Sequence, residues 1–532
     1  MKLFRKKPTP IEAMQSASKR FACLLACLIL LMSACGGGGG SSGSINTSTS
    51  TWQSGVYKPQ SVYENKCASP RSGIDPWTDK PFLDKNGTLL DEKNFLRSWS
   101  NDTYLWYNEI VDVDPSKTED PLDYFDLLKT TAKTASGNYK DNYHFTYDSS
   151  VWYDLSESGI SAGYGMELSL INRYAPNRNV VVAYTEPGSP AAEKNVKRGA
   201  KIIKVDGYDF LNGNTQYIID KLNAGLFPQA LNEVHTIEIL NIGASTTEQV
   251  VLTSASITKT PVQNVKVIDT PTGKVGYFVF NDHIKPAERG LYDAINNLKA
   301  QNVSDLILDI RYNGGGSLSI ANQLAYMIAG NKIAPSAIFE KIIFNDKYQA
   351  PAPVLFDDKA PDEIGGSLPS LNLPRVFVIT SGDTCSASES IINGLRGVGV
   401  EVIQIGSKTC GKPYGFYPHD NCGTTYFTIQ LKGVNNTGFG EYSDGFIPSV
   451  ADNGRDFIKG CALGDDLSHQ LGDEAEKNLA TALTYRETTS CTLLTSAASV
   501  PFQLQKTAAP DELSDVSGTL NKPAGLTNRI MR

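Results

Sequence analysis

A serine and a lysine in the second half of the chain have the spacing and surroundings that nucleophilic catalysis requires. Ser386 opens the run Ser386-Ala387-Ser388-Glu389, which joins a predicted strand to a predicted helix, and Lys412 follows Gly411 after one more strand. A serine hydroxyl attacks a carbonyl carbon when a base takes its proton, and a lysine amine is such a base once burial lowers its pKa. One helix and one strand between the two residues can return the chain to the same end of a sheet. The pair therefore predicts acyl transfer by a Ser/Lys dyad.

Ser386 and Lys412 each have a plainer explanation as well. The Ser386 run is formally a capping box, in which the hydroxyl accepts a hydrogen bond from the main-chain N–H of Glu389. A loop lysine is exposed by default and has a pKa of about 10.4, so catalysis at neutral pH requires burial to lower that pKa by roughly 3. Neighbours that could bury it are Tyr414, Phe416, Tyr417 and Phe427. Lys408 and His419 remain competing candidates for the base.

A glycine-rich loop could stabilise the negative charge that such an attack creates. The run Asn313-Gly314-Gly315-Gly316 follows a predicted buried strand over residues 306–310. Consecutive glycines can turn main-chain N–H groups toward an oxyanion, and the N–H of Ala387 at a helix start is a second donor. The loop lacks the trailing Lys-Ser/Thr of a phosphate-binding loop, so we expect no nucleotide cofactor.

The elements that must position these residues indicate an α/β layer over residues 261–460. Predicted strands cover residues 275–280, 306–310, 376–379 and 402–405, and predicted helices lie between them. Alternation of strand and helix is the pattern of a mixed sheet covered by helices. Both candidate loops stand at the carboxyl ends of strands, where open α/β sheets build their sites.

Residues 151–260 have the texture of a small β domain. Its pieces Gly163-Tyr164-Gly165-Met166, Glu186 to Ala191 and Arg198 to Gly207 follow in an order that resembles a PDZ domain. Such a domain adds an extended peptide to its sheet, and a loop, here Gly163 to Met166, binds the terminal carboxylate. The alternative is a β domain with a packing role, in which Tyr164 and Met166 fill the core.

The remaining regions divide into a helical domain and a C-terminal segment. Residues 76–150 predict a small helical domain, because apolar and aromatic residues recur at near-helical spacing from Phe95 to Trp106. Residues 461–532 predict one helix, over Asp473 to Tyr485, and then a poorly ordered tail. The predicted fold class is therefore multidomain α+β.

The N-terminus predicts export and a lipid anchor. Residues 1–34 contain a basic region and an apolar stretch too short to span a bilayer, which indicates a signal peptide. Ser33 and Ala34 before Cys35 resemble the bacterial lipoprotein box, and Gly36 in place of Asp favours the outer membrane of the cell envelope. Residues 35–75 then predict a flexible tether. The alternative is an ordinary cleaved signal peptide.

Charge and cysteine content narrow the function further. The chain has 49 Lys plus Arg, 57 Asp plus Glu and a net charge of −8, which gives no reason to expect a nucleic-acid partner. Six cysteines in the exported part predict disulfides in an oxidising compartment, with 15 possible pairings. They are Cys67, Cys385, Cys410, Cys422, Cys461 and Cys491. The five histidines are scattered and no HExxH occurs, so no metal site is expected.

Three motifs in order resemble the carboxyl-terminal processing protease family of serine peptidases. They are Leu306-Ile307-Leu308-Asp309-Ile310-Arg311-Tyr312-Asn313-Gly314-Gly315-Gly316, Cys385-Ser386-Ala387-Ser388-Glu389 and Gly411-Lys412. The resemblance extends over residues 161–459. It implies a catalytic domain of the crotonase/Clp-like type that cleaves protein substrates. It also implies Ser386 as nucleophile, Lys412 as base, and oxyanion donors at Ala387 and at Gly314 or Gly315.

Three features depart from the family pattern. The distance in sequence from Ser386 to Lys412 is one residue longer than usual, and Phe416 stands where many members have a Gln that orients the Lys. Cys385 and Cys410 bracket the site and could form a bridge across it. The sequence thus predicts a lipid-anchored serine endopeptidase. The missing Gln keeps open an inactive protein of the same architecture that binds peptides or small ligands.

Overall fold

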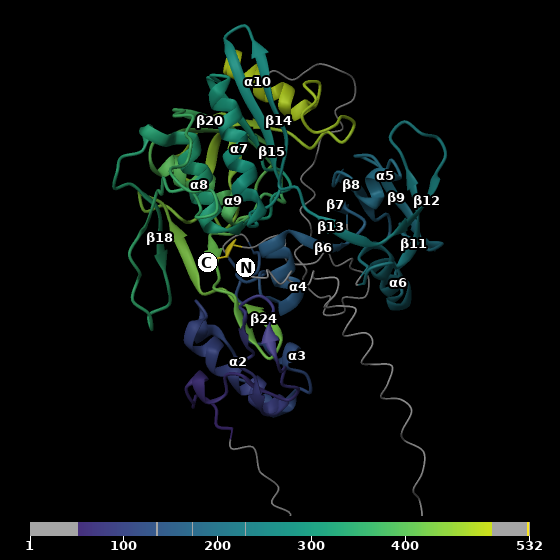
Figure 1. Ribbon diagram of the computed structural model, residues 1–532, viewed down its shortest axis with the longest axis vertical. Coiled ribbons are helices and arrows are strands. Elements are labelled where there is room, and N and C mark those ends of the chain that lie inside the picture. The colour runs from purple at the N-terminus through teal and green to yellow at the C-terminus, as the bar shows by residue number, and fades with distance from the viewer. Residues whose placement is uncertain (1–51, 135–136, 173, 229, 492–528, 531–532) are drawn as a thin grey trace, which may run out of the picture. The chain divides into compact units, whose positions relative to one another are not determined.

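A computed structural model describes residues 52–134, 137–172, 174–228, 230–491 and 529–530 (Figure 1). The predicted signal peptide over residues 1–34, the lipidated Cys35 and nearly all of the predicted tail lie outside these residues. No helix in the described ranges combines the length and the apolar character needed to cross a bilayer.

A seven-stranded sheet forms the centre of the predicted α/β layer. Its order is β14-β15-β16-β20-β21-β27-β26. The bounds are β14 Val262–Thr270, β15 Gly273–Phe280, β16 Asp305–Asp309, β20 Arg375–Thr380, β21 Glu401–Gly406, β26 Ile447–Ser449 and β27 Phe457–Ala462. β14 pairs antiparallel with β15, and the other neighbours are parallel. Every residue of β16 is buried, as expected for a parallel strand with both faces covered.

Helices cover both faces of this sheet (Figure 1). The helices are α7 Pro286–Ala300, α8 Leu318–Ala329, α9 Ala387–Gly397 and α10 Lys477–Thr488. The first three pack against Phe278, Leu308 and Val378, whereas α10 packs against the alternate side chains Tyr277 and Phe377. α10 begins later than the sequence predicts, because Glu476 caps it by accepting the N–H of Leu479 at 3.0 Å.

The region predicted to resemble a PDZ domain is a β-rich unit with a largely antiparallel sheet in the order β12-β11-β9-β8-β7. Its elements are β6 Ile160–Gly163, β7 Met166–Asn172, β8 Asn179–Thr185, α5 Pro190–Glu193, β9 Lys201–Val205, β10 Tyr208–Asp209, α6 Gln216–Leu226, β11 Val234–Leu240, β12 Glu248–Thr253 and β13 Ala255–Thr258. The Tyr164 side chain fills the core and donates a hydrogen bond to the carbonyl of Gly225 at 3.0 Å. Met166 packs against the same core. Peptide binding by this loop stays a prediction.

The N-terminal part contains helices and short strands. They are the 3₁₀ helix Gln60–Val62, β1 Lys66–Cys67, β2 Ile74–Asp75, β3 Lys80–Pro81, β4 Lys85–Asn86, α2 Leu89–Thr103, the 3₁₀ helices Tyr107–Glu109 and Pro115–Lys117, α3 Pro121–Asp126, β5 Phe145–Asp148, α4 Ser149–Tyr153 and the π-helix Asp154–Ser158. Residues 52–75, which were expected to belong to the flexible tether, thus carry secondary structure. The structured part begins earlier than predicted because β1 pairs with β4 and Cys67 is bonded to Cys422.

Short strands and one 3₁₀ helix fill the connections around the large sheet. They are β17 Gly316–Ser317, the 3₁₀ helix Gly330–Lys332, β18 Ile338–Ile343, β19 Val354–Leu355, β22 Tyr414–Gly415, β23 His419–Asn421, β24 Thr424–Phe427, β25 Leu431–Val434 and β28 Arg529–Ile530. β24 pairs with β5, which joins the N-terminal part to the segment after Lys412.

All six cysteines outside the first 35 residues are paired, as the even count suggests. The disulfides are Cys67–Cys422, Cys385–Cys410 and Cys461–Cys491. The bridge across the candidate site, which the sequence leaves open, is therefore formed.

A buried carboxylate lies where the β-rich unit leads into the large sheet. Glu186 is 7% exposed, and its Oε2 accepts hydrogen bonds from the Thr260 N–H at 3.0 Å and from Gln263 Nε2 at 3.3 Å. Burial raises the pKa of Glu186 from its usual 4.5 to about 7, although the Thr260 hydrogen bond and Lys259 oppose the change. The folded chain therefore binds this proton more tightly than the unfolded chain.

This linkage predicts a pH-dependent effect of Glu186→Gln. The stability linked to the Glu186 proton is fully present below pH 4.5 and is lost as the pH rises through about 7. Gln keeps an acceptor oxygen and cannot ionise, so the variant should raise the free energy of unfolding at pH 8 by about 1–3 kcal/mol and leave it nearly unchanged at pH 5. Urea unfolding at both pH values measures this. Glu248→Gln, on an exposed position of β12, is the control, and an equal effect of Glu186→Gln at both pH values would contradict the linkage.

Candidate active site

Ser386 stands at the start of α9 in a conformation that non-glycine residues rarely adopt. Its φ is 60° and its ψ is −113°, a strain of about 1–3 kcal/mol that tightly packed surroundings must hold. The residue is 0% exposed, and its hydroxyl has no hydrogen-bond partner within the described ranges. The main-chain N–H donates to Glu389 Oε2 at 2.9 Å. The Glu389 side chain thus forms its half of the predicted capping box.

Glu389 joins the serine turn to the lysine loop. Its Oε1 accepts hydrogen bonds from Thr409 Oγ1 at 2.6 Å and from the Gly411 N–H at 2.8 Å. Its Oε2 accepts the N–H of Ser386 at 2.9 Å and the N–H of Lys412 at 2.8 Å. One carboxylate oxygen therefore holds the main chains of both predicted catalytic residues. From the sequence, Glu389 is predicted only as part of a helix cap.

Lys412 is completely buried among aromatic rings. Its Nζ lies 4.2 Å from the centre of the Phe416 ring and 4.5 Å from the centre of the Tyr143 ring. Burial holds the pKa of Lys412 well below its usual 10.5, although the negative charges of Asp141 and Glu389 act in the opposite direction. The neutral amine, the form that can accept a proton, is thereby favoured.

Part of this burial comes from the N-terminal part of the chain. Asp141 is itself buried, and it accepts hydrogen bonds from Tyr104 Oη at 2.7 Å and from the Tyr143 N–H at 2.9 Å. A cavity of about 230 Å³ lies beside this segment, and its lining includes Lys140, Tyr143, Cys410, Gly411, Tyr414 and Ser443. This contact could not be predicted from the sequence, since nothing local to residues 139–143 indicates it.

The two competing bases lie in different surroundings. Lys408 is exposed. The His419 ring packs against Phe95 and Trp99 at centroid distances of 5.2 and 5.4 Å, and its Nε2 lies 3.4 Å from Glu64 Oε1. Neither shares the Glu389 carboxylate with Ser386, so Lys412 is the better candidate.

The glycine loop docks directly onto the start of α9. The carbonyl of Asn313 accepts the N–H of Cys385 at 3.1 Å and Oγ of Ser388 at 3.0 Å. Gly316 has a φ of 131°, and a Cβ there would lie 2.8 Å from the carbonyl oxygen of His283, so only glycine fits. The Gly315 N–H already donates to Asn313 Oδ1 at 2.9 Å. Gly314 is therefore the better of the two predicted oxyanion donors.

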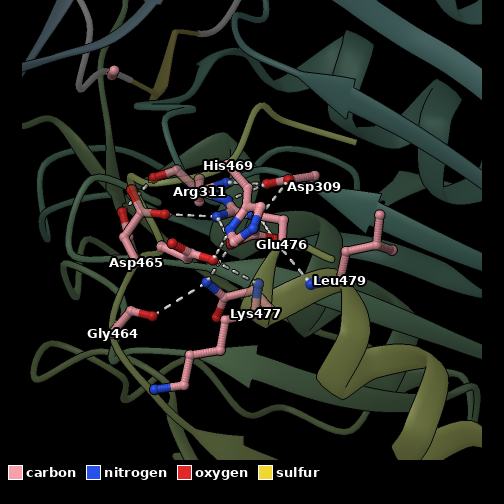
Figure 2. Close-up of polar contacts among 12 residues, drawn as sticks. Asp309, Arg311, Gly464, Asp465, His469, Glu476, Lys477 and Leu479 are labelled. Carbon is pink, nitrogen blue, oxygen red and sulfur yellow. Dashed lines mark hydrogen bonds and ion pairs between the residues drawn. The ribbon is translucent and has the colours of Figure 1, made fainter. Parts of the chain in front are cut away.

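A buried ion cluster fixes the strand end that carries this loop. Figure 2 shows the Arg311 guanidinium between Asp309, Asp465 and Glu476. Its Nε and Nη2 donate to the two oxygens of Asp309 at 2.9 and 2.8 Å, and its Nη1 donates to Asp465 at 2.7 Å and to Glu476 at 2.9 Å. Arg311 is 1% exposed, so the carboxylates replace its lost hydration. The cluster holds the chain two residues before Asn313.

Comparisons with known proteins find similar peptidases. The profile described as "Peptidase family S41" matches residues 274–417. The chain is 24% identical over 258 residues to a "Carboxyl-terminal-processing protease" of Picosynechococcus sp., a match that covers 48% of this chain and 56% of that protein. It is 28% identical over 269 residues to a "C-terminal processing peptidase, chloroplastic" of Tetradesmus obliquus, covering 48% of this chain and 52% of that protein. The chain thus spans about half the length of these relatives.

A solved structure shares the fold. A protein described as an S41 protease from Bacteroides fragilis NCTC 9343 superposes with a TM-score of 0.56 and 22% sequence identity, over 74% of this chain and 97% of that chain. At this identity the likeness supports the mixed α/β fold alone.

The role of Glu389 predicts a large loss of stability in Glu389→Gln. Each carboxylate oxygen of Glu389 accepts two hydrogen bonds, whereas an amide has only one acceptor oxygen. In the variant, the NH₂ group would therefore face two donors and leave them without an acceptor. We expect the free energy of unfolding to fall by about 2–4 kcal/mol in urea titrations. Glu441→Gln removes an exposed carboxylate that pairs with Lys432 at 3.1 Å and should cost less than about 1 kcal/mol. Equal losses in the two variants would contradict the assigned role.

Proposed function

We propose that this chain, which belongs to the carboxyl-terminal processing protease family of serine peptidases, hydrolyses peptide bonds of protein substrates through Ser386 and Lys412. The observation that carries the proposal is the fully buried Lys412, whose main chain shares one Glu389 oxygen with the main chain of Ser386. The low pKa of Lys412 supports its role as the base.

The first step forms an acyl-enzyme. The Lys412 amine takes the proton of the Ser386 hydroxyl as Oγ attacks the scissile carbonyl carbon. The N–H groups of Ala387 and Gly314 bind the oxyanion of the tetrahedral intermediate, and the N-terminal end of α9 adds its positive dipole. Hydrogen bonds of catalytic groups often tighten only in the substrate complex, which is consistent with a Ser386 hydroxyl that has no partner within the described ranges.

The second step releases the products. The Lys412 ammonium gives its proton to the leaving amine, and the amine departs. Lys412 then takes a proton from a water molecule that attacks the acyl-enzyme carbonyl, and the carboxylate product leaves as Ser386 regains its proton. Both steps require Lys412 to change its charge near neutral pH, which an exposed lysine with an ordinary pKa does not do.

We further propose that the β-rich unit binds substrate and that the protein is attached in the cell envelope. The loop Gly163-Tyr164-Gly165-Met166 would bind the terminal carboxylate of a substrate through main-chain N–H groups, since the Tyr164 side chain is committed to the core. Three disulfides fit an oxidising compartment. Export with a lipid on Cys35, and attachment to the outer membrane, would hold the peptidase in the envelope.

An inactive peptide-binding or ligand-binding protein is the second candidate. The observation in its favour is that Phe416, and not a Gln, lies beside Lys412. The two functions differ in one measurable property, namely the reactivity of Ser386.

The dyad predicts that both Ser386→Ala and Lys412→Met abolish activity. Reaction of Ser386 with a fluorophosphonate probe, and hydrolysis of an unstructured protein, should each fall by about 10³-fold or more, because the nucleophile or its base is lost. Lys408→Met is the matched control, and it should react at nearly the wild-type rate because Lys408 is exposed. An unlabelled wild type would favour the binding protein, and full activity in Lys412→Met would exclude Lys412 as the base.

The low pKa of Lys412 predicts the pH dependence of labelling. The amine is protonated and inactive at low pH, so the rate of fluorophosphonate labelling should rise as the pH rises through the lowered pKa and level off well below pH 10. Labelling rates between pH 5 and pH 10 measure this. A rate that keeps increasing up to pH 10 would indicate a base with an ordinary lysine pKa.

A further inference from the structure

A disulfide joins the two segments that carry the predicted catalytic residues. Cys385 directly precedes Ser386, and Cys410 precedes Lys412 by two residues. The other two bridges lie elsewhere. Cys67–Cys422 joins β1 to the β23–β24 turn, and Cys461–Cys491 joins β27 to the segment after α10. The Cys385–Cys410 bridge is thus the one whose state bears directly on the site.

The bridge works alongside the Glu389 hydrogen bonds. The Cys410 N–H donates to the carbonyl of Thr384 at 3.0 Å, so main chain and side chains both join the two segments. Sγ of Cys410 lies 3.4 Å from Glu389 Oε2, the oxygen that accepts the N–H of Ser386 and of Lys412. The bridge therefore restrains the same separation that Glu389 sets.

Opening this bridge must change that separation. Two sulfur atoms that are no longer bonded need van der Waals separation, so they move apart. Cys385 is 1% exposed and adjoins the strained Ser386, which leaves it little room to move. Cys410 is only half-buried, so more of the displacement should fall on the loop that it shares with Lys412. A free Cys410 thiol also becomes a donor to Glu389 Oε2 and competes there with the two main-chain N–H groups.

One end of the bridge lies beside a cavity. Cys410 is half-buried and lines the cavity of about 230 Å³ together with Tyr143, Gly411 and Tyr414, whereas Cys385 is buried. We propose that the Cys385–Cys410 disulfide positions Ser386 relative to Lys412, and that a dithiol reductant which opens it at Cys410 turns the peptidase off. The inference rests on the proposed function and adds a redox control to it.

The reaction is thiol–disulfide exchange. A thiolate of the dithiol attacks Sγ of Cys410, forms a mixed disulfide and expels Cys385 as a thiolate, which takes up a proton. The second thiol of the reductant then loses its proton and attacks the reductant's sulfur in the mixed disulfide. Cys410 leaves as a thiolate and takes up a proton. The protein gains two electrons and two protons, and the dithiol is oxidised to a disulfide. Oxidation reverses the change.

The experiment compares oxidised and dithiothreitol-treated full chain. Alkylation and peptide mass spectrometry of a parallel sample show which bridges have opened. Opening of Cys385–Cys410 should lower the rate of fluorophosphonate labelling at pH 7 by about tenfold or more, and reoxidation should restore it. The labelling profile should also shift to higher pH, because a displaced Lys412 becomes hydrated. A merely stabilising bridge would leave this profile in place.

Paired variants separate this bridge from the other two. Cys67→Ser with Cys422→Ser, and Cys461→Ser with Cys491→Ser, should keep the response to dithiothreitol. Cys385→Ser with Cys410→Ser should label slowly under both conditions. If this variant does not fold, the labelling rate of the reduced wild type still tests the proposal. Circular dichroism then shows whether the reduced wild type remains folded.

Three outcomes count against the switch. The first is a wild type with the bridge open that labels at the oxidised rate and with an unchanged pH profile. The second is a fall in rate that accompanies loss of folded structure. The third is a response to dithiothreitol that disappears when Cys67–Cys422 or Cys461–Cys491 is removed. Failure of the proposed function looks different, because the oxidised wild type would then label no faster than Ser386→Ala.

Discussion

The site depends on one buried carboxylate that is satisfied by four donors from two segments of the chain. A charged group in the protein interior is costly unless hydrogen bonds replace its hydration, and Glu389 receives them from Thr409, Ser386, Gly411 and Lys412. Because two of these donors are the main-chain N–H groups of the predicted nucleophile and base, satisfying the carboxylate also sets the distance between them. The strained main chain at Ser386 can persist only in such surroundings.

The Glu389 carboxylate and burial act on the pKa of Lys412 in opposite directions. A negative charge near Lys412 favours the ammonium form, which cannot act as a base. The desolvation of Lys412 outweighs the attraction of both Glu389 and Asp141, so the net pKa is well below the usual value. Part of this desolvation comes from Tyr143, which belongs to the N-terminal part of the chain. That part therefore forms some of the surroundings of Lys412, in addition to being a group of helices and short strands.

The sequence predicted those parts of the site whose residues lie close together in the chain. A strand, a turn and a helix over residues 375–397 place Ser386 at the start of the helix, and the glycine run predicted a loop beside it. The partners of Glu389 beyond Ser386, and those of Arg311, could not be read in this way. Asp465 and Glu476 lie more than 150 residues after Arg311, and their pairing follows from packing of α10 on the sheet. Six cysteines likewise allow many pairings, and only the fold selects one.

Phe416 shows how a departure from the family pattern can be compatible with the chemistry. A Gln beside Lys412 would exchange hydrogen bonds with the amine. An aromatic ring attracts a cation through its quadrupole and has little attraction for a neutral amine. Nζ lies over both Phe416 and Tyr143, so the two rings stabilise the ammonium that forms when Ser386 loses its proton more than they stabilise the resting amine. Since catalysis benefits from interactions that strengthen as the reaction proceeds, this pair of rings lowers the cost of the charged state at the point where the proposed mechanism needs it.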